Sequence, residues 1–456
     1  MELANKKVTL VGLGRSSVAA AQLLLRHGAC PFITEVGSSR TLAPWQEQCR
    51  QLHIPFETGG HSDAVFQQAE LIVVSPGVPP AASSVAAARQ QGIPVIGELE
   101  LAWRFCTART IAVTGTNGKT TVTALLHDMI ASCGHSVALA GNNDTPLSTV
   151  VAAAQQPEWV VLEVSSYQLE TVEQFHPTIA CVLNVTPDHL SRHGSLAVYA
   201  AVKGRVFDRQ RAGDAAVVNV DDPLAVEMAV PAEVQRLYFS MNGKKQDTFT
   251  ADERYLYHGE AVLAARTDNP LPGKHNLANV LAALAVMHAG GFDQKRTLAG
   301  LRNFKGVEHR IEAVMCLNGV EYYNDSKATN IDSLRVALES FSQPIVLLAG
   351  GRGKGSNYSL LCPLIGERVK HLVVFGEDAP LIAAAYGEIV PVEHALSMMD
   401  AVRRAHNAAK AGDVVLLSPA CASFDMYDNF AARGHDYKDC LQRLTKEVNA
   451  SKELKA

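Results

Sequence analysis

One segment, TGTNGKTT at residues 114–121, restricts the fold of this chain more than any other. It directly follows an apolar run and precedes a stretch with helical periodicity. Gly115 and Gly118 let the backbone wrap closely around a phosphate chain, Lys119 adds a positive charge, and a threonine hydroxyl can bind Mg²⁺. The full phosphate-loop (P-loop) pattern would have a glycine at the position of Val113. Even so, the strand–loop–helix context predicts a nucleotide-binding α/β sheet.

Strand-like and helix-like segments alternate along the rest of the chain, which is typical of parallel α/β sheets. A length of 456 residues suggests three domains, because a domain averages about 150 residues. We predict a Rossmann-like domain over residues 1–98, a P-loop ATPase-like domain over 99–306 and a second Rossmann-like domain over 307–456. The central parallel sheet is expected to carry a small antiparallel β appendage between about residues 235 and 265.

The predicted strands are apolar runs that end at polar or glycine-rich turns. They lie at 8–11, 31–34, 71–74 and 94–96, then 110–114, 159–162, 179–183 and 215–218, and finally 320–323, 345–348, 372–375 and 414–417. A strong helix is predicted over 276–289, where Gly290 and Gly291 end an apolar stripe.

Charge and composition exclude several classes of protein. Lysine and arginine number 41 against 46 acidic residues, a net charge of −5 that gives no basic footprint for nucleic acid or an anionic membrane. No apolar run approaches the roughly 18 residues of a spanning helix, so no membrane insertion is expected. The first residues lack the pattern of a signal peptide, which predicts a cytoplasmic protein. The nine cysteines include no Cys-x-x-Cys pair and are expected to be free thiols.

A second nucleotide signal lies near the N-terminus. Gly12-x-Gly14-x-x-Ser17 is an incomplete dinucleotide fingerprint, and it leaves open an NAD-dependent oxidoreductase. We favour a nucleotide diphosphate at this helix N-terminus, since exposed backbone N–H groups attract phosphate whatever base is attached. Ser75 and Gly77 follow another strand of the same sheet, where ligands of α/β sheets bind.

Three side chains of the central segment are candidates for metal chemistry. Glu163 ends a buried-looking strand in the same unit as the phosphate loop, which suits a metal ligand. His189 is a lone histidine, which on its own is typical of a loop or a helix cap. Lys203 lies among apolar neighbours, where desolvation lowers a lysine pKa. A neutral amine can take up CO₂ to form a carbamate, which then acts as an extra carboxylate ligand.

The C-terminal third contains three polar or glycine-rich segments that directly follow predicted strands. These are residues 324–330, 350–355 and 418–425. Because the ends of parallel strands meet at one edge of a sheet, the three segments predict a second ligand site.

Taken together, the motifs resemble those of the Mur ligases, which build the peptide of peptidoglycan, and the resemblance covers essentially the whole chain. The matching segments are GTNGKTT at 115–121, EVSSYQL at 163–169, N-x-x-x-DH at 184–189, G-x-HN-x-x-N at 273–279, HR at 309–310, NDSKATN at 324–330 and LSPACAS at 417–423. The last two are most similar to the branch of the family that adds D-glutamate to UDP-N-acetylmuramoyl-L-alanine.

The resemblance implies an ATP-dependent, amide-forming ligase that works as a monomer with two Mg²⁺ ions. The carboxylate of the UDP-linked alanine would attack the γ-phosphate of ATP, and the amine of glutamate would then displace phosphate from the acyl phosphate through a tetrahedral intermediate. A carboxylate and a triphosphate repel each other, so cations must screen both.

The resemblance also assigns roles to individual positions. Catalytic roles fall on Lys119, Lys203, His189 and Glu163, and magnesium ligands on Thr120, Glu163, His189 and carbamylated Lys203. ATP-binding positions are Gly115, Thr116, Asn117, Gly118, Lys119, Thr120, Thr121, Asn276, Asn279, Arg310 and Asp325. The UDP-linked substrate would contact Ser75, Gly77, Asn142, Ser165 and Gln168, and glutamate would contact Lys327, Thr329, Lys354, Ser423 and Phe430.

Three segments depart from the usual family pattern. Asn143 and Asp144 replace an isoleucine and a glycine beside the muramoyl site, and Arg352 reverses a charge near the glutamate pocket. Around Glu35 the expected uracil-binding pair is missing. The alternatives that remain are the oxidoreductase, a P-loop switch without synthesis, and a related ligase that adds L-glutamate or another amino acid.

Overall fold

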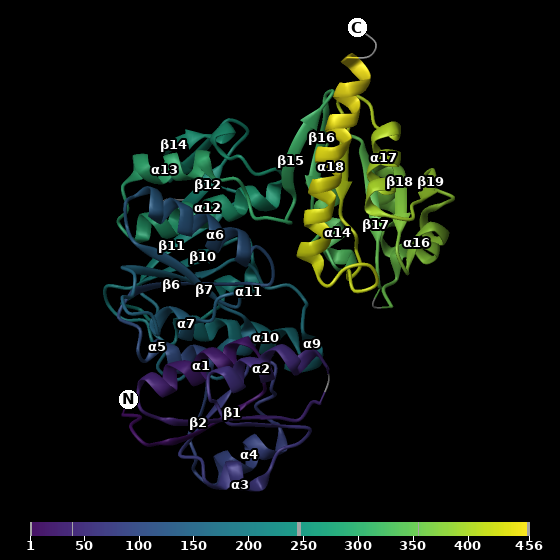
Figure 1. Ribbon diagram of the computed structural model, residues 1–456. Coiled ribbons are helices and arrows are strands. Elements are labelled where there is room, and N and C mark those ends of the chain that lie inside the picture. The colour runs from purple at the N-terminus through teal and green to yellow at the C-terminus, as the bar shows by residue number, and fades with distance from the viewer. Residues whose placement is uncertain (1, 39, 244–247, 354, 454–456) are drawn as a thin grey trace. The chain divides into compact units, whose positions relative to one another are not determined.

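The computed structural model describes residues 2–38, 40–243, 248–353 and 355–453 (Figure 1). Its contacts divide the chain into two compact units. The first combines Met1–Asn269 with Ala278–Phe304, and the second combines Pro270–Leu277 with Lys305–Ala456.

The N-terminal part of the first unit is a five-stranded parallel sheet with the strand order β3-β2-β1-β4-β5. Its elements are β1 Lys7–Val11, α1 Arg15–Arg26, β2 Cys30–Glu35, α2 Ala43–Gln51, β3 Phe56–Thr58, α3 Asp63–Gln67, β4 Leu71–Val74, α4 Ser83–Gln90, β5 Val95–Gly97 and α5 Glu98–Trp103. The short, half-buried strand β3 escaped the sequence prediction because it offers no apolar run.

The central part is a nine-stranded sheet with the order β14-β13-β12-β11-β10-β9-β6-β8-β7. Its strands are β6 Arg109–Thr114, β7 Val137–Gly141, β8 Trp159–Glu163, β9 Ile179–Val182, β10 Ala215–Asn219, β11 Gln235–Ser240, β12 Thr248–Ala251, β13 Tyr255–His258 and β14 Ala261–Ala265. Its helices are α6 Lys119–Ser132, α7 Leu147–Val151, α8 Ser166–Leu169, α9 Leu190–His193, α10 Leu196–Gly204, α11 Pro223–Val226, α12 Lys274–Ala289 and α13 Gln294–Asn303.

The predicted antiparallel appendage is present at the end of the central sheet, but it begins later in the chain than expected. Strand β11 pairs in parallel with β10, and β12 pairs in parallel with β11, so these strands extend the main sheet. Only the β12–β13 and β13–β14 pairs are antiparallel. Between β11 and β12, residues 241–243 form no strand, and Lys244 lies outside the described residues.

Both parts of the first unit share one apolar core, to which Leu101 and Leu147 each contribute. Across the same contact, Ser148 donates its backbone N–H to the buried Glu98 carboxylate at 2.8 Å, and Arg192 donates to the carbonyl of Val78 at 3.0 Å. The contacts therefore group residues 1–98 with the central sheet. The three predicted domain boundaries remain predictions.

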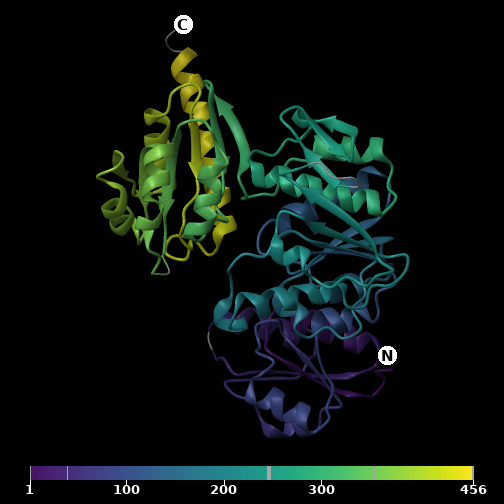
Figure 2. The same ribbon diagram turned by 180° about the vertical axis from the view of Figure 1, so that it is seen from behind.

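The second unit has a six-stranded sheet in the order β15-β16-β20-β17-β18-β19, with β15 antiparallel to β16. Its elements are β15 Glu312–Leu317, β16 Val320–Asn324, α14 Ile331–Glu339, β17 Ile345–Gly350, α15 Cys362–Arg368, β18 Val369–Phe375, α16 Ala379–Tyr386, β19 Val392–His394, α17 Met398–Ala408, β20 Val414–Leu417 and α18 Phe430–Glu453. Helices α17 and α18 share a core on one face of the sheet, and α14, α15 and α16 share the core on the other. Figure 2 shows this unit from behind.

The structure confirms the predicted α/β class, with mainly parallel sheets in both units. Within the part of the chain that the structure describes, no helix is both long and apolar enough to cross a membrane.

Candidate active site

The carboxyl ends of three neighbouring strands bring the main candidates of the first unit to one edge of the sheet. Strand β6 lies between β8 and β9, with Val113 opposite Glu163 and Thr114 opposite Val182. Because all three strands are parallel, the loop after β6, the end of β8 and the residues after β9 meet at that edge.

The P-loop has the backbone that its two glycines predict. Gly118 is left-handed, with φ of +89°, and a Cβ on it would collide with the side-chain oxygen of Asn279. The ammonium of Lys119 donates to the carbonyls of Gly115 and Thr116, each at 2.9 Å. Helix α6 begins at Lys119, so its N-terminal N–H groups point toward the loop, as phosphate binding requires.

Asn184 fastens this loop from the end of β9. Its side-chain oxygen accepts the backbone N–H groups of Thr116 at 3.1 Å and Asn117 at 2.8 Å, and its amide nitrogen donates to the carbonyl of Asn117 at 3.1 Å. The sequence motif at 184–189 contains Asn184 but did not predict this role. Its place directly after a strand of the same sheet was the signal that could have identified it.

Lys203 lies beside the loop and is 1% exposed. Its ammonium donates to the carbonyl of Gly115 at 2.8 Å and lies 4.4 Å from the ring centre of Tyr199. Burial and, to a smaller extent, the nearby charge of Lys119 lower the pKa of Lys203 to about 7, against a smaller opposite effect of Asp188. A substantial neutral fraction near pH 7 follows, as carbamate formation requires.

Glu163 offers a buried carboxylate oxygen with no hydrogen-bond partner. The residue is 5% exposed, and its Oε1 accepts from the Asn142 amide at 3.1 Å, whereas Oε2 has no partner. A buried carboxylate oxygen without a partner is costly. This orphaned oxygen therefore fits a cation ligand, and Asn142 is brought into contact with the same group.

The remaining candidates of the first unit are His189 and the two threonines that follow Lys119. His189 is left-handed, with φ of +52°, half-exposed, and hydrogen-bonded through Nδ1 to the hydroxyl of Tyr167 at 3.1 Å. Thr120 and Thr121 lie in the first turn of α6.

Two of the residues expected to contact the muramoyl group bond to each other. Ser165 is the N-cap of α8, and the Gln168 side chain accepts its backbone N–H at 3.0 Å, which forms a capping box. In the N-terminal part, the hydroxyl of Ser75 donates to the carbonyl of Gly12 at 3.4 Å, and Gly77 is exposed.

In the second unit, Asp325 is a buried carboxyl at the end of β16. It accepts from the hydroxyl of Ser418 at 2.8 Å and from the backbone N–H of Ile311 at 3.2 Å. Burial raises the pKa of Asp325 to about 7, although these bonds and the charge of Arg310 act in the opposite direction. Arg310 lies between two non-glycine residues of positive φ, His309 at +64° and Ile311 at +44°. Such backbone strain is typical of functional sites.

The glutamate candidates are partly brought together. The ammonium of Lys327 lies 5.4 Å from the ring centre of Phe430, and Ser423 is 2% exposed. Thr329 is half-buried. Lys354 lies outside the described residues. Asn276 donates to the carbonyl of Pro272 at 2.7 Å in the first turn of α12.

In each of the three segments that depart from the family pattern, a charged side chain forms an ion pair or hydrogen bonds. Asp144 forms an exposed ion pair with Arg15 at 2.5 Å, and Arg352 pairs with Glu377 at 2.7 Å. Glu35 accepts the backbone N–H groups of Leu13 at 2.8 Å and Gly37 at 2.6 Å. Glu35 therefore braces the turn after β1.

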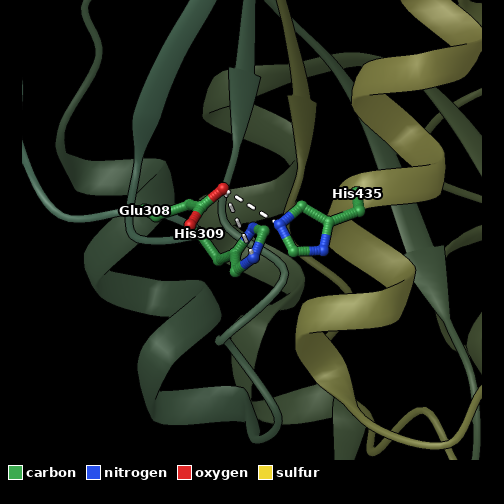
Figure 3. A group of neighbouring side chains, drawn as sticks. All are labelled: Glu308, His309 and His435. Atoms are coloured by element: carbon green, nitrogen blue, oxygen red, sulfur yellow. Dashed lines mark hydrogen bonds and ion pairs between the residues drawn. The ribbon is translucent and has the colours of Figure 1, made fainter.

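One group of side chains in the second unit has the composition of a metal site, namely Glu308, His309 and His435 (Figure 3). Burial lowers the pKa of His309, so its ring is neutral. The Asn324 amide nitrogen lies 2.9 Å from His309 Nδ1 and also faces a Glu312 oxygen at 3.1 Å, so it is the donor. The ring proton then sits on His309 Nε2, the atom that faces the group.

That proton leaves no lone pair on His309 for a metal ion. Lys438 is a second obstacle, because its ammonium already pairs with Glu308 at 2.5 Å. The residues present therefore do not fit a metal ion.

Comparison with known proteins gives a consistent result along the chain. Residues 6–97 match the N-terminal domain described as Mur ligase MurD-like, residues 113–287 the Mur ligase middle domain, and residues 309–421 the Mur ligase glutamate ligase domain.

Two curated relatives match almost the full length. The chain is 42% identical to the UDP-N-acetylmuramoylalanine–D-glutamate ligase of Koribacter versatilis, over 98% of this chain and 99% of the relative. It is 40% identical to the enzyme of the same name from Pelodictyon phaeoclathratiforme, over 98% and 100%.

Among solved structures, the UDP-N-acetylmuramate–alanine ligase of Thermotoga maritima superposes with a TM-score of 0.61 at 18% identity, and the match covers 96% of this chain and 100% of the other. At that identity the likeness shows the fold alone.

Proposed function

The chain is a member of the Mur ligase family, and we propose that it joins D-glutamate to UDP-N-acetylmuramoyl-L-alanine at the expense of ATP. The observation that carries this proposal is the near-full-length match to enzymes named for that reaction. The buried residues at the P-loop edge support it, since they offer the groups that phosphoryl transfer to a carboxylate needs.

The reaction has two steps. A carboxylate oxygen of the UDP-linked alanine attacks the γ-phosphorus of ATP, an acyl phosphate forms, and ADP leaves. The amine of D-glutamate then attacks the acyl carbon, and the tetrahedral intermediate expels phosphate and loses a proton to give the amide. Both steps bring anions together, so the main task of the protein is to screen charge and fix geometry.

We assign the screening of phosphate charge to the P-loop. Lys119 supplies a cation whose ammonium donates to two loop carbonyls, and that ammonium would turn toward the β- and γ-phosphates. The N–H groups at the start of α6 would bind phosphate oxygens. Asn279, packed against Gly118, lies near enough to the loop to contact the nucleotide.

The donor set at this edge fits magnesium. Glu163 with its orphaned oxygen, Thr120, His189 and carbamylated Lys203 would hold it directly or through water. Two Mg²⁺ ions bound there would neutralise phosphate charge and polarise the transferred phosphoryl group.

The environment of Lys203 supports the proposal that it is carbamylated. The neutral amine attacks CO₂, a C–N bond forms, one N–H proton is released to water, and a carbamate carrying one negative charge results. The Lys203 pKa of about 7 makes the neutral amine available at cytoplasmic pH. Lys119 lies close enough to lower that pKa, so it would also stabilise the new anion.

The amino acid is assigned to the second unit. Lys327 supplies a cation near Phe430, and Thr329, Ser423 and Lys354 complete the proposed set. Asp325 and Arg310 belong to the same unit and are assigned to the ribose and a phosphate of ATP. The alternative, a ligase for L-glutamate or another amino acid, is not favoured by the named relatives.

We place the reaction in the cytoplasm, where ATP and UDP-linked precursors are available, and we expect a monomer. The test is phosphate release by the full chain with ATP, Mg²⁺, UDP-N-acetylmuramoyl-L-alanine and D-glutamate. Phosphate is expected only when all are present, and D-glutamate should exceed L-glutamate and other amino acids. Equal turnover with L-glutamate, or turnover that requires NAD, would overturn the proposal.

A further inference from the structure

Arg433 is a fully buried cation that the proposed reaction does not use. It lies in the first turn of α18 and is 0% exposed. By volume it is the largest fully buried side chain among the described residues. Its guanidinium donates to Ser326 twice, from Nε to the hydroxyl at 3.0 Å and from Nη2 to the carbonyl at 2.7 Å. Its Nη1 donates to the carbonyls of Cys421 at 3.0 Å and Gly350 at 3.4 Å.

These acceptors lie on three adjacent strand ends of the C-terminal sheet. Ser326 follows β16, Cys421 follows β20, and Gly350 ends β17, in a sheet whose order places β20 between the other two. They belong to the three segments in which the sequence predicted a second ligand site. One side chain therefore connects every loop of that site.

The same turn of α18 makes further contacts with these loops. The hydroxyl of Ser326 donates to the carbonyl of Phe430 at 2.7 Å. A Cβ on Gly434 would collide with the ring of His309, so this helix position must be glycine for the ring to pack there. The backbone N–H of Lys327 in turn donates to the carbonyl of His309 at 3.1 Å. Arg433 and Gly434 thus hold both the 324–330 loop and the turn before β15.

Stability alone does not account for an arginine here. Among the described residues no carboxylate forms an ion pair with Arg433, and its four bonds are to neutral oxygens, although the charges of Asp425 and Asp325 act on it from farther away. Burial lowers the pKa of Arg433 to about 10, which still leaves the guanidinium charged at neutral pH. A buried charge without an ionic partner is expensive, and apolar replacements of buried charges are often neutral or stabilising. What an apolar residue cannot supply is a rigid, planar fork of five N–H donors.

We propose that Arg433 is a positioning residue of the amino-acid site: its guanidinium fixes the loops after β16, β17 and β20 in one mutual arrangement, without contacting substrate. The proposal rests on the proposed function, because it takes the amino acid bound by these loops to be D-glutamate. Loss of the fork would leave each loop intact but misplace Lys327 and Ser423 relative to each other.

The test compares Arg433→Met, Arg433→Lys and Ser326→Ala with a control on the same helix. Arg443 is exposed and supplies that control as Arg443→Met. We expect the KM for D-glutamate to rise roughly ten- to a hundredfold in Arg433→Met, since misplacement of binding groups by about 1 Å can have effects of that size. Arg433→Lys should recover only part of this loss, because lysine keeps the charge but not the fork. The KM for ATP should rise far less than that for D-glutamate, because Asp325 of the same loop is only one proposed ATP contact and the P-loop supplies the main phosphate contacts.

Several outcomes would overturn the proposal. One is an unchanged KM for D-glutamate in a folded Arg433→Met protein. Another is complete recovery in Arg433→Lys, which would show that charge alone matters. A third is a fall in apparent kcat that matches the loss of folded protein while the KM values of all substrates stay unchanged, which is the signature of a purely structural role.

If the Arg433 variants do not fold, Ser326→Ala decides the question. It removes one acceptor of the fork, so it should raise the KM for D-glutamate by roughly threefold and that for ATP by less. No change would overturn the proposal. Failure of the wild-type chain to use D-glutamate would instead contradict the proposed function, and it is seen before any variant is made.

Discussion

Two cationic side chains, Lys203 beside the P-loop and Arg433 beside the C-terminal strand ends, are both desolvated by burial but end with different pKa values. Both are almost completely buried and donate to backbone carbonyls. Burial penalises the charged form of each, but arginine starts from a higher pKa. The Lys203 pKa therefore reaches about 7, and that of Arg433 only about 10.

The difference separates two uses of a buried cation. A lysine that loses its proton near neutral pH becomes a nucleophile, and it can be converted by CO₂ into an anion that binds metal. An arginine that keeps its proton remains a fixed fork of donors, suited to holding loops. We therefore assign Lys203 a chemical role, because its amine itself reacts. We assign Arg433 a positioning role, because its donors hold the loops around it.

The largest expected effect comes from replacing Lys203 with arginine, the residue type that the C-terminal region uses as its buried cation. In Lys203→Arg the side chain stays charged and cannot take up CO₂, so kcat should fall roughly 10²–10³-fold, the scale for loss of one preorganised charge stabiliser. Lys203→Ala should lose a similar amount but regain activity in the presence of a small carboxylic acid, which can occupy the carbamate position. Steady-state phosphate release measures both.

The control for Lys203 is Lys295→Arg, an exposed lysine on α13 that should retain wild-type activity. A ¹³C NMR signal for a lysine carbamate, seen in wild type under labelled CO₂ and lost in Lys203→Ala, gives an independent measurement. Wild-type turnover in Lys203→Arg would show that the lysine does not act through a carbamate.

The second effect concerns Asp325, the buried carboxyl of the C-terminal edge. Its pKa is about 7 in the folded chain, against 3.8 for an ordinary solvated aspartate, so the folded state binds the proton more tightly than the unfolded state. Stability should therefore fall as the pH rises from about 4 to about 7 and level off above, by about 1.4 kcal/mol per pH unit in that window. Asp325→Asn cannot titrate and should lose this slope, gaining about 2–3 kcal/mol relative to wild type between pH 5 and pH 7.

Chemical denaturation at the two pH values measures this difference for Asp325→Asn. Asp332→Asn, an exposed carboxylate on α14, is the matched control and should follow the wild-type slope. An Asp325→Asn protein whose stability declines with pH as steeply as wild type would show that Asp325 is ionised across the window. The C-terminal edge would then contain a charged pair with Arg310 in place of a neutral carboxyl.

The sequence predicted those parts of the molecule that local chemistry determines. The P-loop, the strand that ends at Glu163 and the main apolar strands were all predictable, because glycine position and apolar runs are local signals. The parallel pairing of β11 with β10 was missed, since alternating apolar residues specify a strand but not its partner. Arg433 was missed for the same kind of reason: its acceptors lie 12, 83 and 107 residues away, and the helical pattern around it shows nothing unusual.

The smallest expected effect concerns how each edge holds its loops. The C-terminal loops are held by a helix side chain, whereas the P-loop is held by Asn184 from the neighbouring strand end. Asn184→Ala removes two acceptor bonds and one donor bond, each worth about 1 kcal/mol net. Only part of that energy orders the loop for nucleotide, so the affinity for ADP should weaken by roughly tenfold, equivalent to about 1.4 kcal/mol.

Asn219 provides the comparison that makes this prediction specific. It also lies at the end of a strand of the same sheet, and its amide donates to the carbonyl of Leu183 at 2.8 Å, next to Asn184 but not to the loop. Asn219→Ala should therefore lower thermal stability by an amount similar to Asn184→Ala while ADP affinity stays within about threefold of wild type. If the two variants weaken ADP binding equally, the order of the P-loop depends on the strand ends as a whole. The P-loop would then be held collectively, and the contrast with the single-residue arrangement at Arg433 would become sharper.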